Sequence, residues 1–313
     1  MILRGLTDSM GKVNVNSEGA NNYSRLNKKK LSWVSSSNVL LVPALIVLLF
    51  YAASLYFLFE TSFYPFIRPG EIGADLTLKN YIKALTDSLY VETLYVTFRV
   101  SFFATIVALL IGYPVAYRIV RTNSRFVRAA LIISVAVPFL TNVIVRMYTL
   151  SLTLGNTGLI NTVLHSTGIL PESKIIPMMR TELGVGIGLV YFVLPFVIFT
   201  LTSSFRRLDQ ELTEAAQSLG AGKVASFFLV TLPLSKPGII GAASLSFILC
   251  VPAFSIPLLL GEGSVLMIAN AIYDRVLFAE NLPFGAALAV LALIITLIFL
   301  ILQMRLTRQR YHA

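Results

Sequence analysis

Six long apolar stretches constrain this chain more than any other feature of its sequence. A helix needs about 20 consecutive, mostly apolar residues to cross the hydrocarbon core of a bilayer. Six parts of the chain meet this requirement: residues 38–60, 93–117, 129–154, 183–204, 238–261 and 284–304. The sequence therefore predicts an all-α membrane protein, in which six transmembrane helices form a single domain over residues 38–310.

The composition agrees with a membrane protein and excludes several other classes. Only 13% of the 313 residues are charged and 56% are hydrophobic, whereas a soluble domain carries about 25% charged residues because its surface faces water. The mean hydropathy is +0.80. Cys250 is the only cysteine, and His165 and His312 lie far apart, so we expect no disulfide and no metal site. A water-soluble enzyme is excluded.

The basic residues predict the orientation in the membrane. Of the 25 Lys and Arg residues, 17 lie on the side that holds both termini, six lie in the opposite loops and two lie within spans. Cytoplasmic loops carry the excess of Lys and Arg, so both termini are expected in the cytoplasm. Residues 1–37 are predicted to be a disordered cytoplasmic tail. Because the charges are scattered over short loops, no nucleic-acid surface is expected.

The segment between the fourth and fifth spans, residues 205–237, is predicted to begin with a short amphipathic helix. Asp209 is suited to cap its N-terminus, and Glu211 suits the positive end of the helix dipole. Apolar residues then recur at helical spacing and form one stripe. The stripe consists of Leu208, Leu212, Ala215 or Ala216, and Leu219.

A glycine turn and a second helix are expected next. Gly220-Ala221-Gly222 is expected to end the first helix, and Pro233 and Pro237 are expected to end the second, which covers residues 223–231. A hairpin lying on the membrane surface is one interpretation. The small residues Ala215, Ala216 and Gly220 favour another, in which a partner protein approaches the backbone closely.

This loop resembles the EAA loop of permease subunits in bacterial ABC importers. The matching residues are Glu214-Ala215-Ala216, Gly220 six residues after Glu214, Val230 where the family usually has isoleucine, and Leu232-Pro233. The resemblance implies a type I ABC importer permease fold. It also implies that the first loop helix is a coupling helix, which docks on an ATP-hydrolysing subunit through Glu214, Ala215, Ala216 and Gly220, with Leu232 and Pro233 completing the motif.

Shorter matches in the right order resemble the spermidine/putrescine branch of that family, over about residues 38–310. They are Thr77-Leu78-Lys79-Asn80-Tyr81, Gly112-Tyr113-Pro114, Val137-Pro138-Phe139, Thr141-Asn142, Arg146-Met147-Tyr148, Leu194-Pro195-Phe196 and Pro283-Phe284-Gly285-Ala286-Ala287. The resemblance implies a multi-pass protein of the bacterial inner membrane. Its implied partners are ABC ATPase subunits, a second homologous permease, an extracytoplasmic solute-binding protein and the lipid bilayer.

The chain itself is not expected to be an enzyme. A phosphate-binding loop needs GxxxxGK[ST], but the nearest stretch, residues 219–224, lacks the first glycine and ends in Val224. No cofactor is therefore expected in this chain, and the resemblance assigns ATP and Mg²⁺ to the partner ATPase.

Two arginines fall inside predicted spans, where an unpaired charge is costly. Arg146 either lines or gates the translocation path or belongs to a structural ion pair, and Glu60 is a candidate partner. Arg99 is expected to snorkel to the outer interface. Polar residues near Arg146 make this stretch the predicted intramembrane path. They are Thr141, Asn142 and Tyr148.

The cargo is less constrained than the class of transporter. The outer loops hold nine acidic residues against six basic ones, which suits a cationic polyamine but equally suits a solvated loop surface. An amino-acid derivative, another organic cation or a sugar-like solute remains an alternative. A secondary transporter is a further alternative. It would need a coupling-ion site built from intramembrane acids, and only Glu60 lies near the membrane.

Overall fold

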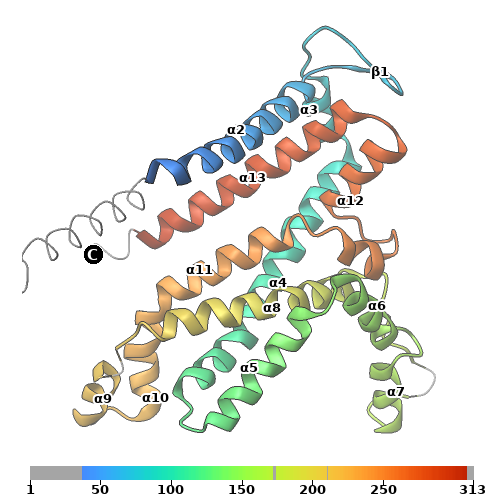
Figure 1. Cartoon of the computed structure of the whole chain (residues 1–313). Coiled ribbons are helices and arrows are strands. Elements are labelled where there is room, and N and C mark those ends of the chain that lie inside the picture. The colour runs from blue at the N-terminus through green and yellow to red at the C-terminus, as the bar shows by residue number, and fades with distance from the viewer. Residues whose placement is uncertain (1–36, 172–173, 210, 309–313) are drawn as a thin grey trace, which may run out of the picture. The chain divides into compact units, whose positions relative to one another are not determined.

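The computed structural model describes residues 37–171, 174–209 and 211–308 (Figure 1). The chain divides into two compact units, residues 1–57 and 58–313. The described part of the first unit belongs to helix α2 (Ser37–Thr61), whose last turn falls in the second unit. The predicted disordered tail lies almost entirely outside the described residues and stays a prediction.

The second unit is mostly helical. A two-stranded hairpin, β1 (Phe66–Arg68) with β2 (Glu71–Ile72), precedes its first complete helix. The helices that follow are α3 (Lys79–Thr86), α4 (Ser88–Arg121), α5 (Arg125–Leu140), α6 (Val143–Leu154), α7 (Leu159–Ser166), α8 (Glu182–Phe205), α9 (Glu211–Ser218), α10 (Lys223–Ser226), α11 (Leu232–Cys250), α12 (Ile268–Tyr273) and α13 (Leu282–Arg308), with short π-helical segments η1 (Phe227–Thr231), η2 (Pro257–Gly261) and η3 (Asp274–Phe278).

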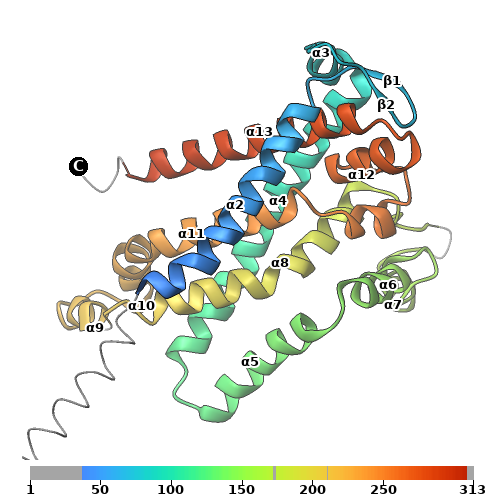
Figure 2. The same cartoon turned by 45° about the horizontal axis from the view of Figure 1, so that its top comes forward.

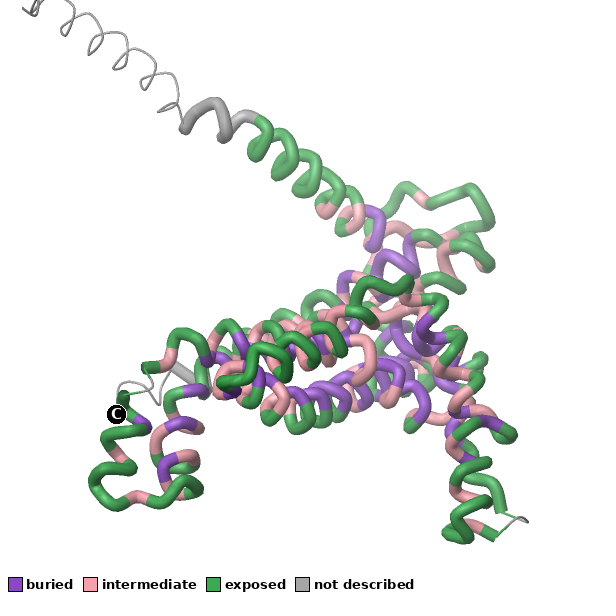
Figure 3. Tube along the Cα trace, turned by 60° about the horizontal axis from the view of Figure 1, so that its bottom comes forward, coloured by how far each residue is buried: buried purple, intermediate pink, exposed green. Residues whose placement is uncertain are grey.

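Five helices in the described part of the chain are long and apolar enough to span a membrane, and a bent pair raises this number to six if it counts as one span. This confirms the predicted all-α membrane fold. The core of the second unit lies where α4, α8 and α11 pack together (Figure 3). Its fully buried residues include Ala108, Ala116, Val193, Val197, Leu201 and Ala242.

Small residues let these helices approach closely. A Cβ atom at Gly238 on α11 would overlap the side chain of Ser204 on α8. We expect Gly238→Ala to destabilise the protein by about 1–3 kcal/mol, because overpacking forces the two helices apart. Thermal unfolding of the purified protein measures this.

Gly241→Ala is the matched control, because a Cβ atom at Gly241 meets nothing within 4 Å. Its stability should stay near that of the wild type. Adding Ser204→Gly to Gly238→Ala should restore most of the loss. Equal stability of the Gly238 and Gly241 variants would contradict the packing argument.

The predicted third span, residues 129–154, is not one helix. It is broken into α5 and α6, and the chain turns by 103° between them (Figure 2). Thr141 and Asn142 both adopt extended backbone angles, and the Asn142 Oδ1 accepts a 2.8 Å hydrogen bond from the Ile144 amide. This cap starts a new helix in a new direction, which the run of apolar residues did not reveal.

The predicted fifth span, residues 238–261, was also misplaced. The helix that crosses here covers Lys223–Cys250, through α10, η1 and α11, and ends before residue 251. Pro233 and Pro237 do not end it as predicted. Pro233 lies directly after η1, inside this continuous helix. The preceding turn η1 has π-helical hydrogen bonding, with the Leu232 amide donating to the Phe227 carbonyl.

Candidate coupling site

The loop between α8 and α11 folds as a helix, a glycine turn and a second helix, as predicted. Asp209 Oδ1 accepts a 2.9 Å hydrogen bond from the Glu211 amide at the start of α9. Figures 1 and 2 show α9 and α10 together beyond the adjacent ends of α8 and α11. The loop therefore lies at the end of the bundle that the charge pattern predicts to be cytoplasmic.

Gly220 ends α9 in a conformation that favours glycine. Its φ is +93°, in the left-handed region. The Gly220 amide donates to the Gln217 carbonyl and the Ala221 amide donates to the Ala216 carbonyl, both at 3.0 Å. These bonds satisfy carbonyl groups at the helix end. A Cβ atom at Gly220 would meet nothing within 4 Å, so the turn is open to a partner.

The apolar stripe of α9 faces outward. Leu219 is 89% exposed and Leu212 is 49% exposed, and Ala215, between them on the helix, is exposed too. Glu214 is exposed as well but lies on another side of α9, because an advance of about 100° per residue places it about 100° or more from each residue of the stripe. An exposed apolar stripe on a water-facing loop has the character of a docking face for another protein.

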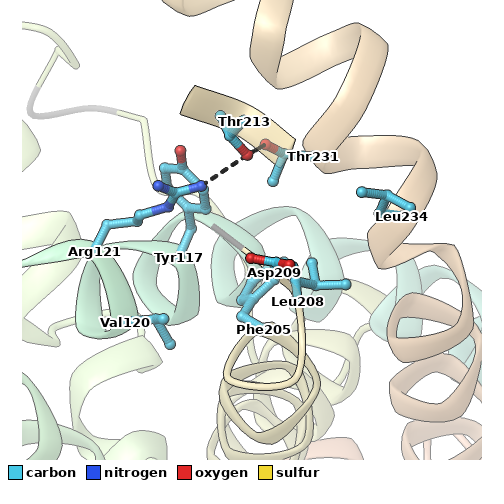
Figure 4. Close-up of a pocket in the computed structure, with 9 residues that line it drawn as sticks. All are labelled: Tyr117, Val120, Arg121, Phe205, Leu208, Asp209, Thr213, Thr231 and Leu234. Atoms are coloured by element: carbon cyan, nitrogen blue, oxygen red, sulfur yellow. Dashed lines mark hydrogen bonds between the residues drawn. The ribbon is translucent and has the colours of Figure 1, made fainter. Parts of the chain in front are cut away.

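The opposite side of α9 is held by polar contacts (Figure 4). Thr213 is buried, and its hydroxyl accepts a 3.1 Å hydrogen bond from Arg121 Nη2 at the end of α4. The same hydroxyl lies 3.5 Å from that of Thr231 in η1. The Arg121 guanidinium also lies over the Tyr117 ring, 5.6 Å from its centroid. These contacts connect α9 directly to α4 and to the start of α11.

We expect Thr213→Val to loosen α9. The substitution keeps the shape of the side chain and removes a hydroxyl that accepts from a charged donor, a bond worth about 1.5–3 kcal/mol. Amide hydrogen exchange in α9 should therefore quicken about ten-fold or more. Ser218→Ala is the control, because the Ser218 hydroxyl bonds only within α9 and is exposed. Equal exchange rates in the two variants would contradict the role of Thr213.

An aromatic cluster fastens η1 to the spans. The Phe227 ring lies 5.9 Å from the Tyr113 ring and 5.5 Å from the Tyr117 ring, both on α4. Phe205, at the end of α8, lies 5.0 Å from Tyr113. All three pairs are edge-to-face, a favourable arrangement for aromatic rings. The Tyr113 hydroxyl also lies 3.0 Å from that of Ser235 on α11, so the cluster joins three spanning helices.

The structure brings some of the predicted loop residues together and separates others. Glu214, Ala215 and Gly220 share the exposed surface of the loop, and Ala216 is half-buried beside them. Leu232 and Pro233 are half-buried at the start of α11 and do not lie on that exposed helix face. Their place in the spanning helix suits a structural role in the motif.

The predicted path residues do not form one surface within this chain. Thr141, Asn142 and Tyr148 are exposed, whereas Arg146 is buried. The Thr141 hydroxyl bonds to the Val137 carbonyl at 3.0 Å and Asn142 caps α6, so both shape the bend. The role of these residues in a path stays a prediction.

Arg99 was expected to snorkel, with Glu60 as the acid nearest the membrane. Arg99 forms an ion pair with Glu182 at the start of α8 and lies over the Tyr95 ring, and its snorkelling stays a prediction. Glu60 accepts a 3.0 Å hydrogen bond from Tyr64. The partner of Arg99 is 83 positions away in sequence, and no local pattern indicated it.

Sequence reasoning also missed the residues that hold the loop: Arg121, Thr213, Thr231 and Phe227. No local pattern indicated them, since Thr213 lies on the side of α9 turned away from its apolar stripe, where a polar side chain is expected to face water.

Comparisons with known proteins agree with this architecture. Residues 104–311 match the binding-protein-dependent transport system inner membrane component family. The spermidine/putrescine transport system permease protein PotB of Haemophilus influenzae is 38% identical over 250 residues, which cover 80% of this chain and 82% of that protein. PotB of Escherichia coli K12 is 36% identical, over 74% of this chain and 83% of that protein.

Solved structures show the same fold. A bacterial alginate ABC transporter, crystallised with an alginate pentasaccharide-bound periplasmic protein, contains a chain with a TM-score of 0.72 at 15% identity, covering 92% of this chain and 97% of that one. A chain of an amino acid ABC transporter has a TM-score of 0.52 at 17% identity, covering 75% of this chain and 100% of that one.

A bundle of membrane-spanning helices with an exposed helical loop at one end defines the class, a transporter permease of the type I ABC fold. This chain belongs to the family of inner membrane components of binding-protein-dependent transport systems. It is a multi-pass inner membrane protein and the permease subunit of an ABC importer, with close homology to the PotB polyamine permeases.

Proposed function

We propose that this chain forms one half of the translocation path for a polyamine such as spermidine or putrescine. A second homologous permease forms the other half. A separate ATPase subunit docks on α9 from the cytoplasm, and an extracytoplasmic binding protein delivers the cargo. The observation that carries this proposal is the exposed apolar stripe of α9, where Leu219 is 89% exposed and Ala215 is exposed too.

The loop contacts support a mechanical role for α9. ATP-driven movement of the docked ATPase subunits displaces α9. Thr213 and Arg121 pass this displacement to α4, and Phe227 passes it to the aromatic cluster. Because α4, α8 and α11 share one close-packed core, they respond as a unit, and the path alternates between outward and inward access.

Polyamine as cargo is supported by the relatives and by charge. The PotB relatives are named for spermidine and putrescine transport. The predicted outer loops carry nine acidic and six basic residues, a net charge of −3. A negative outer surface favours the arrival of a cationic solute. The alginate and amino acid transporters share the fold at low identity and do not bear on the cargo.

Purification of the gently solubilised complex from its native membrane tests the proposal. An ATPase and a second permease should accompany this chain. The binding protein encoded with them should bind spermidine or putrescine more tightly than amino acids or sugars. Preference for another solute would overturn the cargo and keep the importer. A chain that moved solute alone in liposomes without ATP would instead support the secondary-transporter alternative.

A further inference from the structure

Arg146 presents a buried cation that the described part of this chain does not satisfy. The residue is only 7% exposed. Its guanidinium lies over the Tyr191 ring of α8, 5.9 Å from the centroid. Its Nε and Nη1 atoms are enclosed and have no hydrogen-bond partner among the described residues. The contact with the Tyr191 ring offsets only a small part of the hydration free energy that the Arg146 guanidinium loses on burial.

The charge cannot be removed by deprotonation, because a guanidinium stays protonated in proteins. A buried cation without a carboxylate is strongly destabilising. The ion pairs of the described residues join Arg68 to Glu71, Arg99 to Glu182, and Arg180 to Glu262, and none of them includes Arg146. The described part of the chain therefore offers Arg146 no carboxylate.

The surface around Arg146 indicates where the acceptor comes from. No residue of α5 is buried, although α5 with α6 forms the bent candidate span. Apolar side chains are exposed on both sides of the bend, from the last turns of α5 into the first turn of α6. They are Ile133 (58%), Val137 (58%), Leu140 (81%), Ile144 (58%) and Val145 (56%). An apolar surface with one cation behind it fits a protein partner that brings a carboxylate.

We propose that a carboxylate of the second permease subunit forms an ion pair with Arg146 when the α5–α6 surface docks against that subunit. The inference rests on the second permease of the proposed function. The cargo is the weaker candidate, because a guanidinium repels a cationic polyamine. Nη2 is not among the enclosed atoms, so a carboxylate of the partner can approach the guanidinium from that side.

The experiment uses the whole complex, expressed with its partner subunits and purified through a tag on this chain. Arg146→Glu should lower the recovery of the second permease at least ten-fold, at an unchanged membrane level of this chain. Arg68→Glu is the matched control, since Arg68 is a highly exposed arginine on the β1–β2 hairpin. Its recovery should match the wild type.

Charge exchange identifies the partner acid. Each membrane-embedded Asp or Glu of the second permease is changed to Arg in the Arg146→Glu background, and one exchange should restore recovery to within about two-fold. If no exchange restores it, the ion pair is wrong. If Arg146→Glu keeps full recovery, the inference is also wrong, and lost uptake in that variant would then favour a contact with cargo.

Cross-linking keeps the test independent of assembly yield. Cys250 is the only cysteine, so Cys250→Ala provides a background without cysteine. Val145→Cys, next to Arg146 on the exposed side of α6, should then cross-link to a cysteine placed beside the partner acid. Absence of any cross-link to the second permease would overturn the docking surface. Absence of the second permease from the wild-type complex would instead overturn the proposed function.

Discussion

Glu214→Lys is expected to lower ATP-dependent uptake at least ten-fold while the chain remains inserted in the membrane. Glu214 is exposed on α9 and begins the Glu214-Ala215-Ala216 motif, in which Ala215 belongs to the apolar stripe with Leu212 and Leu219. Reversing a charge that becomes buried in an interface leaves unpaired charges on both sides, and losses of about 2–5 kcal/mol are typical. Uptake in cells, and the amount of ATPase recovered with the tagged chain, measure the effect.

Glu211→Lys is the charge-matched control. Glu211 lies one turn earlier on α9, is also exposed, and undergoes the same change of sign. It lies outside the EAA motif, so uptake should stay above about half of the wild-type level, with a small loss from a cation near the helix N-terminus. Equal loss in both variants would show that the net charge of α9 matters and that Glu214 makes no specific contact. Normal uptake by Glu214→Lys would overturn the docking face.

The coupling loop could be predicted because its determinants are local. The Asp209 side chain caps the start of α9, which lies two residues further along the chain. Gly220 adopts the left-handed conformation two residues after the last residue of α9. Capping, helical spacing and glycine turns all act within a few residues, so a single sequence contains them. The burial of Thr213 against Arg121, 92 positions away, depends on how the spans pack, and spacing along the chain does not contain that information.

The bend at Thr141 and Asn142 was missed for a related reason. Hydropathy shows that residues 129–154 are apolar enough for a membrane span. It does not show whether these residues form one straight helix or two helices that point in different directions. Asn142 was visible as a polar residue inside the run, and its capping bond to Ile144 breaks the helix. A polar residue with cap propensity shortly after Pro138 is therefore a signal of a break in the helix, whereas its place in the path stays a prediction.

Phe227→Ala is expected to uncouple ATP hydrolysis from transport. Phe227 makes ring contacts with Tyr113 and Tyr117 on α4 and with Phe228. Aromatic pairs contribute about 0.5–1.5 kcal/mol each beyond the area they bury, so the two pairs that link η1 to α4 account for about 1–3 kcal/mol. The exposed face of α9 is unchanged, so the ATPase should still dock. Uptake per ATP hydrolysed, measured in liposomes, should fall about five-fold or more.

A comparison with Phe126→Ala separates this coupling defect from a general loss of aromatic surface. Phe126 lies at the start of α5, is 82% exposed, and is on the same predicted side of the membrane. Its removal should leave the ratio of uptake to hydrolysis unchanged. If Phe227→Ala lowers ATPase recovery and uptake together, Phe227 supports the docking face itself. If it changes neither, movement of α9 reaches the spans through the contact of Thr213 with Arg121, and the aromatic cluster only stabilises the fold.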